Sequence, residues 1–491
     1  MKTFPNVYLV WITFSLTSAI SSYALAQSQV GPVLQRAAVV ENHKLNLNDH
    51  PELKPPVFYD PWHIMNGIER AQFGADLLSP RTFLPLFDPR PIKSEIDLSK
   101  VDNPFGFTPL NPIFPDPLEV PMRPIRGLEH VLYEQCSTMS NIYYTLVMQS
   151  LSRTLPGYGN FAGVGRLDVN FLTVLAKTPG LGTSAVQILF RQHNVFGQPS
   201  DWTPGRASGS YFFMDSLQNA NNTTLNIVGF QQGLLDDRLV LSVGKLHPNQ
   251  YFMLNFYAND ESRQFLNGSF DGNSVFQPAQ GTYAPGFVAQ MIPCDDIYIN
   301  TAIFDIADYP GDSFQNINAG LYWAGVEVGW TPNWLGTFSR YNVTFGTTNA
   351  GNLSYSGYGD VTGIKQNNSM IGFLAQQQIS DWLGVFAEYG LGDSTGAVAQ
   401  QELSVGLSIV RPFGRQDDDF GIAFAWTKPN NNYGNEVPGS EPQSATVLET
   451  FYRLQITNSM QLSPDLQVSF DPASGDGSPV VALALRLKMQ F

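Results

Sequence analysis

The sequence predicts an all-β fold: a transmembrane antiparallel β-barrel of about 16 strands, preceded by a Pro-rich periplasmic arm and a short amphipathic helix. Three observations lead to this prediction. The chain opens with a secretory signal, its composition combines few charges with many aromatic residues, and most of its length repeats segments of alternating apolar and polar residues.

Residues 1–26 predict export from the cytoplasm. Lys2 precedes an apolar run over residues 7–20, and Ala24-Leu25-Ala26 before Gln27 forms an A-x-A cleavage site. We expect the mature chain to begin at Gln27, where a lipoprotein would carry Cys instead. No later run is continuously apolar enough to span a bilayer as a helix, so residence in a membrane requires a closed sheet. The outer membrane of a Gram-negative-type bacterium is the expected location.

The composition agrees with this fold class. Charged residues make up 14% of the chain, against about 25% in soluble domains, and aromatic residues make up 13%. Such values are typical of a barrel in which only alternate strand residues meet lipid. The net charge of -15 argues against nucleic acid and against an anionic surface as partners. Outer-membrane lipid is expected around the barrel because alternate strand residues are apolar.

Residues 27–126 are predicted to form a separate arm, because they hold 16 of the 34 prolines. Proline removes ladder donors and fixes φ, so this stretch cannot form a sheet and is expected to be mostly irregular. A disordered linker and an extended arm that docks on a periplasmic partner both remain open. The domain at 127–491 then begins with Leu128, Val131 and Leu132 at helical spacing, which predicts a short amphipathic helix over 127–135.

Alternating segments follow that helix to the end of the chain. The last one, 480–491, places Leu485 and Phe491 on an apolar face and Arg486 and Lys488 on the opposite face. A soluble sheet would also alternate, but the length of about 10 residues and the terminal Phe favour a membrane strand. The other clear segments are 141–149, 166–175, 185–193, 238–244, 298–305, 322–330, 338–345, 370–378, 384–389, 402–409, 420–427, 448–457 and 461–470. At roughly 22 residues per strand and loop, the region holds about 16 strands, enough to leave an aqueous channel.

Several stretches run in a recognisable order through this region. They are Val243-Gly244-Lys245-Leu246, Asn255-Phe256-Tyr257-Ala258-Asn259-Asp260-Glu261, Phe386-Ala387-Glu388-Tyr389-Gly390, Arg411-Pro412-Phe413 and Glu449-Thr450-Phe451-Tyr452-Arg453. As an ordered set they resemble the carbohydrate-selective porin family of the OprB type. The resemblance implies a barrel that passes sugars down their gradient and that can assemble into homo-oligomers. The chain departs from the family pattern before the helix, at Arg126-Gly127-Leu128, and its Pro-rich arm has no counterpart there.

Alternation also predicts which side chains face the lumen. The inward candidates for contact with a solute are Arg166, Arg191, Trp323, Glu327, Arg340, Glu388, Glu449, Arg453 and Arg486. Both signs of charge occur, which suits a neutral polyhydroxy solute better than an ion. Small neutral sugars are therefore the expected substrate, with hydroxyl groups for the charged side chains and an apolar face for Trp323. Trp330, Trp426 and Tyr452 fall on the outer face, where we expect them to act as girdle anchors.

Other interpretations remain open. Charges inside a wide barrel commonly form only a solvated wall, so a general diffusion porin or an envelope-anchoring structural barrel would fit the same pattern. An enzyme is not expected, since His193 and His247 lie in no nucleophile-and-base motif. No metal or cofactor is expected either, because Cys136 and Cys294 have no ligand at metal-binding spacing. Whether these two cysteines pair in a disulfide is left open.

Overall fold

The computed structural model describes residues 113–491 apart from 179, 198–203, 211–213, 218–220, 277–282, 307–319, 333–337, 350–366, 381, 394–398, 416, 430–443, 471 and 473–477. The predicted signal peptide and residues 27–112 of the predicted arm lie outside the described residues.

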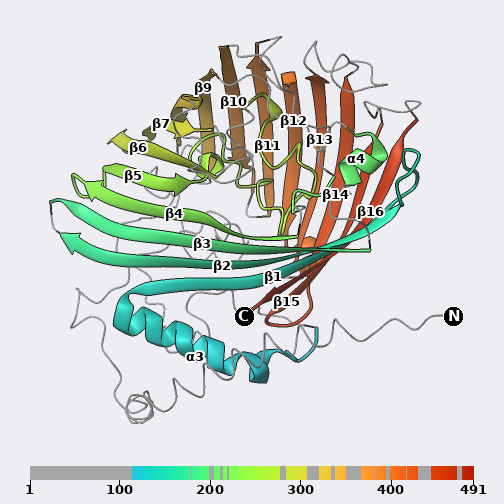
Figure 1. The fold of residues 1–491 in the computed structure, drawn as a ribbon, viewed down its shortest axis with the longest axis horizontal. Coiled ribbons are helices and arrows are strands. Elements are labelled where there is room, and N and C mark those ends of the chain that lie inside the picture. Colours follow the sequence, from blue (N-terminus) through green and yellow to red (C-terminus); the bar gives the residue numbers. More distant parts are fainter. Residues whose placement is uncertain are drawn as a thin grey trace. The chain divides into compact units, whose positions relative to one another are not determined.

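Sixteen antiparallel strands form a closed barrel in the described part of the chain, which confirms the predicted fold class (Figure 1). The strands are β1 (Thr138–Leu151), β2 (Phe161–Thr178), β3 (Gly182–Phe196), β4 (Asn222–Leu234), β5 (Leu239–Leu246), β6 (Ala284–Cys294), β7 (Ile297–Asp305), β8 (Tyr322–Trp330), β9 (Ser339–Thr348), β10 (Asn368–Gln378), β11 (Leu383–Gly392), β12 (Ala399–Val410), β13 (Asp419–Pro429), β14 (Ala445–Gln455), β15 (Met460–Ser469) and β16 (Val480–Gln490). Each strand pairs with the next in the chain, and β1 pairs with β16 to close the ring. Closure removes every sheet edge, as a bilayer requires.

Long and short connections alternate around the barrel. The connections after β2, β4, β6 and β14 are short, whereas those after β1, β3 and β5 are long. Porin-type barrels have short periplasmic turns and longer extracellular loops, which assigns the start of β1 and the end of β16 to the periplasmic rim.

The helix α3 (Glu119–Cys136) precedes β1 and is longer than predicted. It begins at Glu119 rather than at residue 127, inside the region expected to be irregular. Asp116 Oδ1 accepts a hydrogen bond from the Leu118 backbone N–H at 2.9 Å, just before the helix, and Pro121 lies in its first turn, where proline removes no helical hydrogen bond. No helix in the described ranges is long and apolar enough to cross a bilayer.

Two polar contacts join α3 to the periplasmic rim. Ser140 Oγ of β1 donates to Glu129 Oε1 at 3.1 Å, and Arg126 donates to Ser459 Oγ, between β14 and β15, at 2.8 Å. Burial raises the pKa of Glu129 to about 7, although the hydrogen bond from Ser140 and the positive charge of Arg126 both act to lower this pKa.

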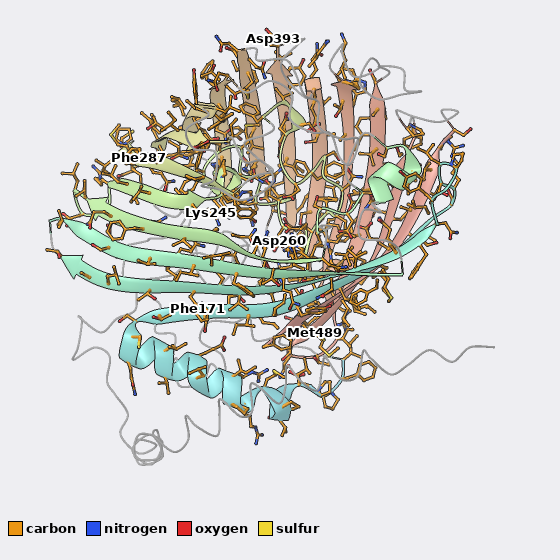
Figure 2. The ribbon with its side chains drawn as sticks, viewed as in Figure 1. Phe171, Lys245, Asp260, Phe287, Asp393 and Met489 are labelled. Atoms are coloured by element: carbon orange, nitrogen blue, oxygen red, sulfur yellow. The ribbon has the colours of Figure 1, made fainter. Side chains whose placement is uncertain are left out.

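The two faces of the wall differ as alternation predicts. On β16, Leu483 and Leu485 are exposed on the outer face, whereas Arg486 is buried on the inner face. Figure 2 shows the same contrast between Phe287, at the outside of the ring of strands, and Asp260, inside it.

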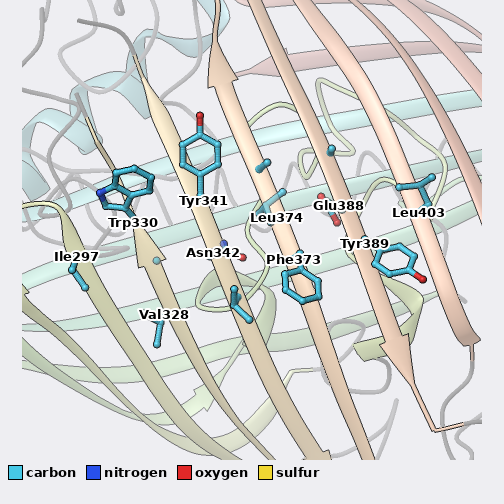
Figure 3. Close-up of a pocket in the computed structure, with 14 residues that line it drawn as sticks. Ile297, Val328, Trp330, Tyr341, Asn342, Phe373, Leu374, Glu388, Tyr389 and Leu403 are labelled. Atoms are coloured by element: carbon cyan, nitrogen blue, oxygen red, sulfur yellow. The ribbon is translucent and has the colours of Figure 1, made fainter. Parts of the chain in front are cut away.

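The outer wall carries a shallow apolar depression over β7 to β12, of about 520 Å³ (Figure 3). Ile297, Val328, Trp330, Phe373 and Leu403 are among the side chains that line it. A surface of this kind belongs in hydrocarbon.

Cys136 and Cys294 are both exposed and neither forms a disulfide.

Candidate functional site: the lumen and its inserted loop

The connection between β5 and β6 folds into the barrel, and we call its residues 247–276 the inserted loop. No residue between 248 and 263 is exposed. Aromatic side chains of the loop pack on aromatic side chains of the inner wall: Phe252 lies edge-on to Trp323 at 5.1 Å between ring centroids, and Phe265 lies edge-on to Phe451 at 5.0 Å. These contacts give the lumen an apolar core between the loop and the wall from β5 to β14.

Buried carboxylates of the wall hold the loop backbone. Glu327 Oε2 accepts the Met253 N–H at 2.7 Å. Glu449 accepts two successive backbone N–H groups, Leu266 at 2.5 Å and Asn267 at 2.9 Å. Glu402 Oε1 accepts the Ser274 N–H at 3.0 Å. Hydrogen bonds to a carboxylate are stronger than those between neutral groups, so these contacts fix the course of the loop.

A fourth carboxylate and a glutamine act near residue 255 of the loop. Glu388 Oε1 accepts from Asn255 Nδ2 at 2.6 Å. Gln376 accepts the Phe256 N–H at 2.7 Å and donates to the Leu254 carbonyl at 2.9 Å. These contacts use both the donor and the acceptor of the Gln376 amide, which makes the fit specific to this backbone path.

Cations of the wall bind the loop from the same inner face. Arg340 donates to the Leu254 carbonyl at 3.2 Å and forms an ion pair with Glu327 at 2.9 Å. Arg486 donates to the carbonyls of Glu261 at 2.8 Å and Gln264 at 2.7 Å. The loop is therefore anchored on strands as far apart in the sequence as β9 and β16.

A second loop segment enters the lumen from the connection between β3 and β4. Its Met214 carbonyl accepts from Gln149 of β1 at 3.0 Å and from Gln467 of β15 at 2.9 Å. The Ser216 N–H donates to the Leu266 carbonyl at 2.8 Å, so the two inserted segments meet inside the barrel. Burial raises the pKa of Asp215, beside this contact, to about 7.

The wall formed by β2 and β3 carries a compact cluster of charges opposite the inserted loop. Arg166 Nε donates to Asp168 Oδ2 at 2.6 Å, and its guanidinium also pairs with Glu261 of the loop. Arg191 pairs with the other oxygen of Asp168. Two cations and two anions thus nearly neutralise one another. The Arg191 side chain is 15% exposed and that of Glu261 10%, so the cluster reaches open space.

Two rings extend this cluster. The guanidinium of Arg191 lies over the Tyr283 ring at 5.4 Å, and the Tyr283 ring stacks on His247 at 4.4 Å with an interplanar angle of 24°. Both rings are only half-buried. The stack joins an apolar face to charge-assisted donors within one short stretch of the passage.

The sequence pattern of the carbohydrate-selective porin, OprB family matches residues 159–491, well over half of the chain. The chain belongs to this family. It is an integral outer-membrane porin of a Gram-negative-type bacterium, and family and fold point to a channel rather than an enzyme.

Relatives and solved structures agree with this assignment. Porin AaxA of Chlamydia caviae is 25% identical over 288 residues, which cover 53% of this chain and 59% of that relative; porin AaxA of Chlamydia abortus gives the same values. The match thus spans about six tenths of the relatives' length. The high-pH structure of Pseudomonas putida OprB superimposes with a TM-score of 0.61 at 16% identity, covering 74% of this chain and 96% of that chain, and supports the fold.

All nine candidate residues lie on the inner face of this porin, but they do not lie together. Six of them contact the inserted loop and are at most 2% exposed: Trp323, Glu327, Arg340, Glu388, Glu449 and Arg486. Arg166 and Arg191 form the charged cluster on β2 and β3. Arg453 is apart from both groups, at the periplasmic rim, where its Nε donates to Asp419 at 2.9 Å.

Sequence reasoning missed four residues of the lumen: Gln376, Glu402, His247 and Tyr283. Alternation could have identified the first two, since they lie on the inner face of β10 and β12. His247 and Tyr283 lie in connections, where no periodic signal indicates direction.

Proposed function

We propose that this porin lets small neutral sugars diffuse passively and saturably through its lumen. The observation that carries the proposal is the cluster of Arg166, Asp168, Arg191 and Glu261 beside the half-buried Tyr283. Its paired charges leave little net field to select an ion, while they offer donors and acceptors to sugar hydroxyl groups. The family's description as carbohydrate-selective supports the same substrate class.

The nine candidate residues take different parts in this proposal. Arg191 contacts the sugar directly, because it has the largest exposed fraction among the arginines of the lumen cluster and lies over an aromatic ring. Because Arg191 and His247 both lie against the Tyr283 ring, the His247 ring offers the stacking face for the apolar side of the sugar ring. Arg166 holds Asp168 and Glu261 in place.

The residues beneath the inserted loop do not contact the sugar themselves. They position the loop and thereby set the width of the passage: Trp323, Glu327, Arg340, Glu388, Glu449 and Arg486. Arg453 contributes a donor at the periplasmic rim. Assembly into homo-oligomers and a periplasmic partner for the arm stay predictions.

The proposal is tested by single-channel current with glucose and a maltose-sized sugar as blockers. Wild-type current should fall to a plateau as sugar concentration rises, and Arg191→Ala should need several-fold more sugar for the same block. Arg238→Ala is the matched control, since Arg238 also pairs with an aspartate but lies in a periplasmic turn. If the wild-type conductance does not change with sugar concentration and scales only with bulk salt, the protein is a general diffusion porin instead.

A further inference from the structure

The turn between β12 and β13 holds the most exposed large apolar side chain among the described residues. Phe413 is 92% exposed. Its backbone has φ 55° and ψ 22°, and Arg411 has φ 60° and ψ 40°. Residues other than glycine rarely adopt this left-handed backbone conformation, so the turn holds the Phe413 ring outward at a cost in backbone strain. The turn around Phe413 takes no part in the lumen contacts described above.

Buried groups hold the strained turn in place. The Arg411 N–H donates to the Asp418 carbonyl at 3.0 Å. The Asp418 carboxylate, which is fully buried, accepts from the Tyr452 hydroxyl at 2.8 Å and from the Gln455 N–H at 3.0 Å. Arg415 donates to the same carboxylate. These contacts restrict the turn to one conformation, so the Phe413 ring occupies a defined position.

The ring lies on the outer side of the barrel. Phe413 stacks on Tyr452 at 6.1 Å between centroids with an interplanar angle of 25°, and Tyr452 is on the outer face of β14, opposite the buried Phe451 and Arg453. It therefore does not cover the mouth of the lumen.

The neighbouring periplasmic turn continues the same apolar rim. Trp382 is 48% exposed and Ile379 53% exposed, and the Val410 N–H donates to the Trp382 carbonyl at 3.0 Å, which joins the two turns. Aromatic side chains at the ends of membrane strands partition into the region between headgroups and acyl chains.

We propose that Phe413 is a leaflet anchor: a ring held out by a strained turn to enter the headgroup boundary of the periplasmic phospholipid leaflet. The occupant is the membrane rather than a second copy or a soluble protein, because the ring is continuous with the lipid-facing wall through Tyr452 and Trp382. The anchor fixes the depth of the barrel on its periplasmic side.

The direct test places a nitroxide at residue 413, by Phe413→Cys in a full-length chain that also carries Cys136→Ser and Cys294→Ser. The purified porin is folded into phosphatidylethanolamine and phosphatidylglycerol vesicles. Asp295→Cys in the same background is the control, since Asp295 is 79% exposed in another periplasmic turn. The label at 413 should collide more often with lipid-soluble oxygen, and several-fold less often with a water-soluble nickel complex, than the label at 295. Equal nickel accessibility at both positions would overturn the proposal.

A second measurement uses no label. Phe413→Gly relieves the left-handed backbone strain. If the ring has no role in the membrane, the unfolding midpoint of this variant should equal or exceed that of wild type in both micelles and vesicles. A leaflet anchor predicts a lower midpoint in vesicles and no loss in micelles, with Phe413→Trp retaining the wild-type midpoint in both. A loss of the same size in micelles and vesicles would contradict the anchor.

Discussion

Glu449 offers the sharpest perturbation of the inserted loop. Its two carboxylate oxygens accept the N–H groups of Leu266 and Asn267, and its side chain is fully buried. In Glu449→Gln the amide keeps one acceptor oxygen, loses the charge, and turns an NH₂ group toward the second N–H. The change is close to isosteric, so the barrel itself should still fold.

The magnitude follows from those two contacts. A hydrogen bond to a charged group contributes about 1.5–3 kcal/mol, and a neutral one about 0.5–1.5 kcal/mol. Replacing two of the first kind by one of the second should destabilise the docked loop tip by roughly 2.5–4.5 kcal/mol. At tenfold per 1.4 kcal/mol, the population with a released tip rises roughly 60- to 1600-fold.

Single-channel recording at constant voltage measures this population. Wild-type channels should show one steady level, and Glu449→Gln should add frequent excursions to a higher conductance, because the released tip widens the passage. Glu119→Gln is the control, since Glu119 is 54% exposed on α3. Traces of Glu449→Gln that match both wild type and this control would refute the anchoring role.

Three further predictions concern other parts of the molecule. Leu485→Arg puts a charge on the lipid face and should cost roughly 2–4 kcal/mol near the midplane, seen as poor folding into vesicles, whereas Arg486→Leu should assemble but show a noisier current. Gly384→Ala would place a Cβ 2.0 Å from the Tyr257 ring of the inserted loop, so it should raise conductance without loss of the barrel, and unchanged conductance would contradict the packing. Glu129 has its pKa raised from 4.5 to about 7 in the folded protein, so the folded state binds the extra proton. Docking of α3 should therefore be strongest below about pH 4.5 and weaken as pH rises to about 7; hydrogen exchange of α3 checks this, and Glu129→Gln should abolish the dependence.

The fold was largely predictable because the barrel imposes period-2 alternation on nearly every strand. β4 and β6 were not among the clear segments, for physical reasons. β4 is interrupted by a register shift against β3, and β6 contains Pro285, Gly286 and Pro293 in eleven residues, with a further shift against β7. The pattern does not predict the early start of α3, because Pro121 and Pro124 both argue against a helix; the first turn tolerates Pro121, whereas Pro124 lies inside the helix.

The sequence predicts on which face of the wall each candidate side chain lies, but not which residues it contacts. Alternation placed Glu327, Arg340 and Glu449 on the inner face, yet nothing in a strand pattern shows that a distant loop will cover them. The contacts of Glu449 with Leu266 and Asn267 join residues far apart in the sequence, and only the tertiary fold brings them together. Conversely, Tyr283 and His247 lie in connections with no period, so the stack beside Arg191 had no sequence signal.

The most direct test of the central claim is the initial rate of uptake of radiolabelled glucose into proteoliposomes, measured against glucose concentration without any energy source. A neutral-sugar binding stretch at Arg191 and Tyr283 predicts a rate that rises to a plateau and falls when a maltose-sized sugar competes. A rate that stays proportional to glucose concentration over the whole range, unaffected by the competitor, would contradict it.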